Sequence, residues 1–208
     1  MVVGHANTVE LLGYYGGDET HALSAWTSTS RDLTEEKRSR IPAMLTTLAE
    51  NGHHTPFEKS MLHFLVTTDI ATHIHIIKHR IAVPVNAESA RYKELKDDKF
   101  YIPNDWPEDE QLRLLAFMED ALQAYHEALT RLTPIMGRKR AKESARFYLP
   151  YATQITSDVA FNFRSFMHFQ GLRNDDHAQR EVQDIAQQML DLSRSIGVFN
   201  ASLSAFGY

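Results

Sequence analysis

Alternation of apolar and polar residues predicts strands in part of this chain. The clearest case is 60–68, where Leu62, Phe64 and Val66 fall on one side of an extended backbone. Two further segments are rich in strand-forming residues and are bounded by turn residues. The predicted strands are therefore 8–15, 60–68 and 151–161.

A spacing of three and four residues between apolar positions predicts amphipathic helices elsewhere. In 70–78, for example, Ile70, Ile74 and Ile77 lie on a single side of a helix. Pro134 lies just beyond the clearest helical segment and is expected to mark its end. The helices predicted in this way are 18–26, 34–51, 70–78, 108–132, 138–147, 164–171 and 176–196.

These elements predict the fold class and the domain organisation. Strands and long helices are mixed without regular alternation, which favours an α+β fold over a doubly wound sheet. We expect a central, mostly antiparallel sheet flanked by the long helices. With 208 residues, 43% of them hydrophobic, the chain can bury one core, so 1–208 is predicted to form a single domain.

Composition excludes several classes of function. The net charge is −5 and both signs are interleaved, which argues against nucleic-acid and membrane-surface partners. The chain has no cysteine, so disulfides, thiolate metal sites and cysteine nucleophiles are absent. No run of about twenty apolar residues and no signal-peptide pattern is present, so we expect a cytoplasmic location.

The stretch 78–92 concentrates positive charge beside apolar residues. Lys78, His79 and Arg80 begin it, and Ser89 with Arg91 closes it. A proline between the two groups favours an extended loop with a cationic group at each end. Arginine forks suit phosphate and carboxylate, so a phosphate ligand is the first hypothesis. The alternative for an isolated triplet is a solvated, dipole-stabilising helix end.

Histidine spacing raises a weaker hypothesis of a metal site. His75 and His79 are four residues apart on the predicted helix 70–78 and its end, with His73 nearby. The sequence has no HExxH glutamate and no thiolate, and spacing alone is a weak signal. No metal ligands are therefore assigned.

Three arginines lie at the ends of separate predicted elements: Arg91, Arg146 and Arg173. Each could simply pair with a nearby carboxylate. Arg173, however, stands between a glycine and the predicted helix 176–196, with His177 inside the first turn of that helix. This arrangement suits a fixed polar pocket.

Four segments, taken together, resemble the flavin-dependent thymidylate synthases. Lys78-His79-Arg80 followed by Ser89-Ala90-Arg91 is similar to that family's Arg-His-Arg, seven or eight residues, Ser-x-Arg signature. NGHHTPFEK at 51–59 resembles its Gly-His-x-Thr/Ser-x-x-Glu loop. KESARFYLP at 142–150 and NFRSFMHFQGLRNDDHAQREV at 162–182 resemble two further blocks, in the family's order.

The resemblance implies an activity, its cofactors and an assembly. Enzymes of this family make dTMP from dUMP, taking carbon from 5,10-methylenetetrahydrofolate and hydride from FAD that NADPH has reduced. A chain without cysteine cannot use thiolate addition to dUMP, which is consistent with a hydride-donating cofactor. The family also implies a homotetramer whose active sites share residues between subunits.

The resemblance also implies roles for individual residues. The implied FAD contacts are Ser28, Thr55, Glu58, Lys78, His79, Arg80, Asn86, Asn162, Arg164, His168 and His177. The implied dUMP contacts are His75, Glu88, Ser89, Ala90, Arg91, Arg146 and Arg173.

Within these sets, Arg91, Arg146 and the Ser89 hydroxyl are assigned to the phosphate. For Ser89 the alternative is a nucleophile, but the sequence offers no obvious base to activate it. Arg173 is assigned to the uracil, where it is expected to act catalytically by stabilising developing negative charge. The second implied catalytic residue, His53, and Tyr92 are placed near the folate and nicotinamide.

Three positions depart from the family pattern. Lys78 replaces an arginine and so loses its bidentate fork. His75 stands where the family often has Gln or Glu, and His168 stands where it often has Asn.

Two rival functions remain open from the sequence. One is a nucleotide-binding or regulatory module without redox chemistry, and the other is a histidine-ligated metallohydrolase.

Overall fold

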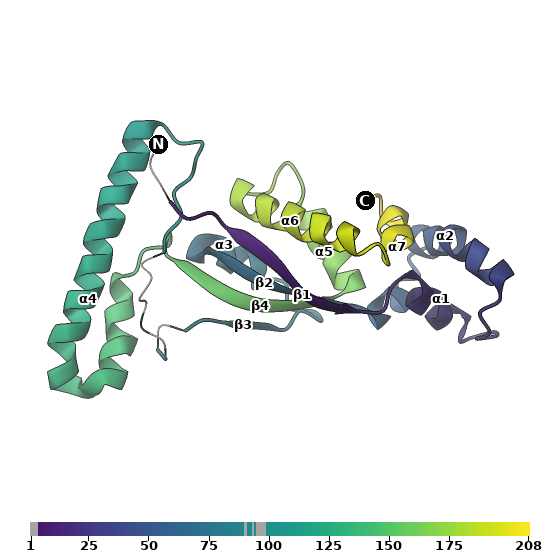
Figure 1. Ribbon diagram of the computed structural model, residues 1–208, viewed down its shortest axis with the longest axis horizontal. Helices are drawn as coiled ribbons and strands as arrows, with labels where there is room; N and C mark the ends of the chain where they lie inside the picture. The colour runs from purple at the N-terminus through teal and green to yellow at the C-terminus, as the bar shows by residue number, and fades with distance from the viewer. Residues whose placement is uncertain (1–3, 90, 93, 95–98) are drawn as a thin grey trace. The chain divides into compact units, whose positions relative to one another are not determined.

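The computed structural model describes residues 4–89, 91–92, 94 and 99–208 and has a mixed α+β fold (Figure 1). Within these residues, strands β1 (Thr8–Tyr15), β2 (Met61–Asp69), β3 (Val85–Ala87) and β4 (Gln154–Asn162) form an antiparallel sheet in the order β1-β2-β4-β3. The predicted α+β class, with one domain built around an antiparallel sheet, is confirmed.

Helices occupy much of the described chain. The described helices are α1 (Asp18–Trp26), α2 (Glu35–Glu50), α3 (Ile70–Ile76), α4 (Glu108–Ala145), α5 (Phe163–Arg173), α6 (Arg180–Ile196) and α7 (Asn200–Ala205), with short 3₁₀ helices η1 (Thr55–Lys59) and η2 (Arg146–Tyr148). Among the described residues, no helix is both long and apolar enough to cross a lipid bilayer.

Contacts divide the chain into two compact units. Unit 1 comprises Met1–Thr8, Thr67–Ile77 and Asn86–Ser157, and unit 2 comprises Val9–Val66, Lys78–Val85 and Asp158–Tyr208. Unit 1 therefore holds α3 and α4, whereas unit 2 holds α1, α2, α5, α6 and α7.

In unit 1, α4 folds back on itself. The reversal is at Gly137, whose φ of 80° is readily adopted only by glycine, and the two arms lie side by side (Figure 1). Tyr125 and Leu129 of the first arm pack in one core with Ala141 of the second. The predicted helix end at Pro134 was wrong, because the helix continues through the proline. An internal proline costs roughly 3 kcal/mol, which packing between the two arms can offset.

Also in unit 1, the end of β2 starts α3. The Asp69 carboxylate accepts a hydrogen bond from the Thr72 backbone N–H (2.8 Å) and another from the Asn7 side chain (2.9 Å). The helix then ends at Ile76, two residues before Lys78. The prediction that His79 continues a helical face with His75 was therefore wrong.

In unit 2, α5 packs on one face of the strands. Phe64 of β2 lies 5.8 Å from Phe166, measured between ring centroids, and Phe161 of β4 lies 5.2 Å from Phe169. Leu62, Phe64 and Val66 are buried, as the alternating pattern predicted.

The Asn162 side chain caps α5 by accepting a hydrogen bond from the Ser165 N–H (2.8 Å). The helix passes through Gly171 and ends at Arg173, and α6 begins only at Arg180. Arg173 therefore belongs to the last turn of α5 and His177 lies in the connecting loop, so the predicted helix start at 176 was wrong. Gly171 is exposed and lies inside the helix, two residues before its end.

A buried histidine joins three segments of unit 2. The His21 ring shares hydrogen bonds with Ser60 (2.6 Å) and Ser202 (2.8 Å), and it is enclosed by the rings of Phe57, Phe163 and Phe199. Burial lowers the pKa of His21 to about 4, so the ring is neutral near pH 7. The contacts hold η1 and the C-terminal α7 beside α1.

Candidate active site

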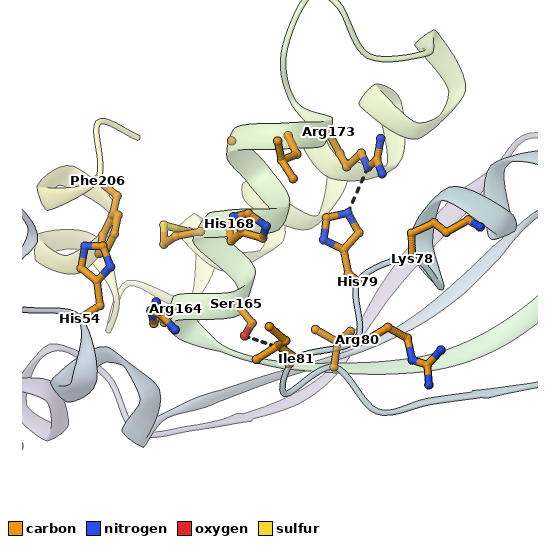
Figure 2. Close-up of a pocket in the computed structure, with 14 residues that line it drawn as sticks. His54, Lys78, His79, Arg80, Ile81, Arg164, Ser165, His168, Arg173 and Phe206 are labelled. Atoms are coloured by element: carbon orange, nitrogen blue, oxygen red, sulfur yellow. Dashed lines mark hydrogen bonds between the residues drawn. The ribbon is translucent and has the colours of Figure 1, made fainter. Parts of the chain in front are cut away.

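A cavity of about 840 Å³ lies within unit 2 (Figure 2). Its walls come from the loop after α3, from one face of α5, from the start of η1 and from the chain after α7. This volume falls in the range of small-molecule sites. The lining residues include His54, Lys78, His79, Arg80, Ile81, Arg164, His168, Leu172, Arg173 and Phe206.

The cavity has basic groups from two elements. Lys78 and Arg80 come from the loop after α3, and Arg164 and Arg173 come from opposite ends of α5. Arg164 Nη1 lies 3.3 Å from Glu58 Oε1, and this ion pair is partly exposed. Lys78, Arg80 and Arg173 form no ion pair with a carboxylate of the described residues, so the lining carries a net positive charge that suits an anionic ligand.

His79 and Arg173 form the most defined contact in the cavity. The Arg173 Nε–H donates to His79 Nε2 (3.1 Å), and the His79 ring packs edge-on against Phe169 (5.0 Å). Burial, and then the positive charge of Arg173 and the neighbouring His168, lower the pKa of His79 to about 4. At neutral pH the ring is therefore uncharged, with Nε2 as acceptor and Nδ1 carrying the proton.

The loop that carries these groups is attached to α5 and β4. Ser165 Oγ donates to the Ile81 carbonyl (2.8 Å), and the Ala160 N–H donates to the Pro84 carbonyl (3.1 Å). Between these contacts, Ala82 has a φ of 52°, which is strained for a residue with a Cβ. The backbone thus holds Lys78, His79 and Arg80 beside α5 rather than continuing the preceding helix.

The residues predicted to contact FAD are only partly gathered here. The cavity is lined by Lys78, His79, Arg80, Arg164 and His168. The other predicted contacts in unit 2 have different surroundings: Glu58 pairs with Arg164, Asn162 caps α5, and Ser28, Thr55 and His177 are exposed outside the cavity lining. Asn86 lies in β3 and belongs to unit 1.

Most residues predicted to contact dUMP belong to unit 1. Arg91 donates through Nε and Nη2 to Glu143 Oε1 (3.3 and 3.2 Å), and this contact lowers the pKa of the Glu143 carboxyl. The Arg91 N–H also reaches Ser89 Oγ (3.3 Å). In this structure Arg91 therefore pairs with a nearby carboxylate, the alternative to phosphate binding that the sequence left open. Ala90 lies outside the described residues.

The remaining predicted nucleotide contacts in unit 1 differ in exposure. Arg146 is exposed at the start of η2, and His75 is half-buried in α3. Glu88 is tied to β4, since its N–H donates to the Thr156 carbonyl (2.8 Å) and its carboxylate accepts from the Thr156 N–H (3.0 Å). Tyr92 is exposed, with the Arg91 guanidinium 5.5 Å from its ring.

His53 is exposed in the turn after α2 and does not line the cavity, although its neighbour His54 does. Within the described part of the chain, no three His, Cys, Asp or Glu side chains gather closely enough to hold a metal ion. The geometry therefore offers a basic and partly apolar cavity with a neutral histidine.

Several cavity residues were not predicted from the sequence motifs. Leu172 follows Arg164 and His168 at intervals of four, so the helical period could have placed it on the same face of α5. His54 stands at the unspecified position of its motif. Phe206 comes from a C-terminal segment that matched no motif, so no sequence signal pointed to it.

Comparisons with known proteins agree with these motifs. A family model described as thymidylate synthase complementing protein matches residues 10–196. A flavin-dependent thymidylate synthase of Pseudothermotoga lettingae is 33% identical over 195 residues, covering 90% of this chain and 85% of that protein. The protein of the same name from Kosmotoga olearia is 30% identical over 202 residues, with coverage of 90% and 85%.

A solved structure has a similar fold over nearly the whole chain. The UMP/dUMP methylase PolB of Streptomyces cacaoi, bound with 5-Br UMP, superposes with a TM-score of 0.80 at 25% identity. The match covers 99% of this chain and 96% of PolB.

Proposed function

Because the chain belongs to the thymidylate synthase complementing protein family, we propose that it is a flavin-dependent thymidylate synthase that methylates dUMP to dTMP. The carbon would come from 5,10-methylenetetrahydrofolate, and NADPH would supply the two electrons that reduce it to a methyl group. The match over residues 10–196 supports the proposal that 1–208 acts as one catalytic domain.

The lining of the cavity in unit 2 supports the proposal of a flavin dinucleotide as its ligand. Lys78 and Arg80 provide cationic donors for a diphosphate, and Ile81, Leu172 and Phe206 provide apolar surface for flat rings. When bound, FAD supplies the hydride that side chains cannot provide. His79 is held neutral, so its Nδ1–H can donate to a polar ligand atom without adding charge.

The observation that carries this proposal is the hydrogen bond from Arg173 to neutral His79 inside a basic cavity. Engaging Nε in this bond orients the two terminal guanidinium nitrogens as a fixed cationic group. Such a group can stabilise negative charge that develops on a uracil ring without reorganising during the reaction. Arg173 is thereby proposed as a catalytic residue.

The proposed roles in unit 1 concern the phosphate of dUMP. Arg91, Arg146 and Ser89 would bind it, and Arg91 would exchange Glu143 for the phosphate when the nucleotide arrives. Its present ion pair is partly exposed, and exposed pairs are weak, so this exchange has a low cost. His53 and Tyr92 remain the proposed contacts for folate and nicotinamide, in a homotetramer whose sites share residues between subunits.

Tritium release from C5-labelled dUMP tests this function. The unaltered chain, supplied with FAD, NADPH and 5,10-methylenetetrahydrofolate, should release tritium only when all three are present. The Arg173→Ala variant should keep its fold and bound flavin but lose turnover, because it removes the fixed cation. Arg131→Ala is the matched control, since Arg131 is exposed on α4, where it pairs with Glu127.

Equal turnover in Arg173→Ala and the unaltered chain would contradict the role given to Arg173. A colourless protein that binds dUMP without releasing tritium would instead favour the non-redox nucleotide-binding module. UMP belongs in the same assay, because the similar structure is that of a UMP/dUMP methylase.

A further inference from the structure

Two aromatic side chains form one end of the cavity of unit 2. His54 and Phe206 lie with ring centroids 5.4 Å apart, and both line the cavity. Figure 2 shows them together on one side of the drawn pocket, with Lys78 and Arg173 on the other side. One end of the cavity is therefore aromatic, with Arg164 beside it paired to Glu58, and the other end carries cations without a carboxylate partner among the described residues.

Phe206 is held in place by packing and by backbone hydrogen bonds. Its ring stands edge-on to Phe57 (4.9 Å) and Phe163 (6.1 Å). Its N–H donates to the Leu203 carbonyl at the end of α7 (3.1 Å). Because these contacts restrict the ring while leaving part of it exposed to the cavity, little conformational entropy would be lost on binding a ligand.

Hydrogen bonds also fix α7, the helix that directly precedes Phe206. The Asp18 carboxylate accepts hydrogen bonds from the N–H groups of Ala201 (2.9 Å) and Ser202 (2.8 Å). The Ser202 hydroxyl bonds both Asp18 (2.6 Å) and the ring of His21 (2.8 Å). The aromatic end is thus built from the C-terminal segment and attached to the core of unit 2.

Neither aromatic residue is assigned by the family resemblance. His54 occupies the unspecified position of the Gly-His-x-Thr motif, and the family match ends at residue 196, ten residues before Phe206. Their role must come from the geometry of this chain.

We propose that Phe206, together with His54, binds one of the two flat heteroaromatic rings of FAD and so determines flavin affinity. This inference rests on the proposed function. Cations at one end of the cavity suit the diphosphate, and the rings of FAD extend away from the diphosphate on both sides. An aromatic wall at the other end offers the face or edge contact that flat heterocycles favour.

Flavin titration of matched variants tests the proposal. Phe206→Leu retains apolar bulk but removes the ring, whereas Phe206→Tyr retains the ring. Titrated with FAD while flavin fluorescence is followed, Phe206→Leu should bind about three- to tenfold more weakly than the unaltered chain. Phe206→Tyr should bind within about twofold. Tyr15→Leu is the control, because Tyr15 is an exposed aromatic residue of unit 2 outside the cavity lining.

FMN distinguishes the two rings. A parallel loss of FMN affinity in Phe206→Leu would identify the isoalloxazine as the ring bound, whereas a loss confined to FAD would identify the adenine. Both results support the proposal. Unchanged FAD affinity in a folded Phe206→Leu variant would overturn it and leave the proposed function standing. Absence of flavin binding by the unaltered chain would overturn both.

Discussion

His21 should make the stability of this protein depend on pH between 7 and 5. The ring is completely buried, and its pKa of about 4 lies below the value of 6.5 for a free histidine. A group with a lowered pKa stabilises the fold above pH 6.5, and this contribution is lost as the pH falls towards 4, because the unfolded chain takes up a proton first. Between pH 7 and pH 5 the loss from His21 alone is about 2 kcal/mol.

The His21→Gln variant isolates this contribution. Glutamine can hydrogen-bond to Ser60 and Ser202 but does not titrate, so the variant is expected to be less stable at pH 7 and less sensitive to pH. Urea unfolding at pH 7 and pH 5, at one fixed protein concentration, gives the free energy of unfolding at each pH. The difference between the two values should be about 2 kcal/mol smaller in His21→Gln.

A packing variant provides the control for His21→Gln. Phe199→Leu loosens the same aromatic cluster without removing a titratable group, so it should lower the free energy of unfolding about equally at both pH values. If the unaltered chain and His21→Gln lose the same free energy between pH 7 and pH 5, the inference that burial keeps His21 neutral is refuted.

Three further variants test the site and its loop. Arg173→Lys keeps the charge but loses the Nε–H that donates to His79. The kcat should therefore fall about tenfold or more, while flavin affinity changes little. An unchanged kcat would contradict the orienting role of the hydrogen bond. Arg146→Gln should raise the KM for dUMP about tenfold or more in steady-state assays; an unchanged KM would remove Arg146 from the phosphate site. Ala82→Gly should raise the free energy of unfolding, measured in urea, by about 0.5–1 kcal/mol, because glycine tolerates a φ of 52°. A lower free energy of unfolding in this variant would show that the turn is not strained.

Local patterns were sufficient to predict most of the elements. The helix Asp18–Trp26 and the strand Thr8–Tyr15 have the predicted bounds, because both are set by neighbouring residues and by the glycines between them. The prediction failed where packing between distant segments decides the backbone. Pro134 stays inside α4, and the residues after Ile76 leave the helix so that His79 can pack against Phe169.

For the cavity too, groups of adjacent residues could be predicted from the sequence, whereas contacts between distant residues could not. The basic triplet Lys78-His79-Arg80 was recognisable in the sequence because its residues are adjacent. The bond between His79 and Arg173 joins residues 94 positions apart, and only the fold of α5 beside the loop creates it. Phe206 could not be predicted, because its place in the cavity depends on the packing of α7 against α2 and α1.

FAD titration of the unaltered chain and of Arg80→Glu tests most directly whether the basic cavity binds a flavin diphosphate. We expect that the unaltered chain binds FAD, that NADPH bleaches the bound flavin, and that Arg80→Glu weakens binding about tenfold or more. Arg131→Glu, which reverses a charge on the surface of α4, should bind FAD as the unaltered chain does. Equal affinity in Arg80→Glu and the unaltered chain, or no flavin binding at all, would contradict the account.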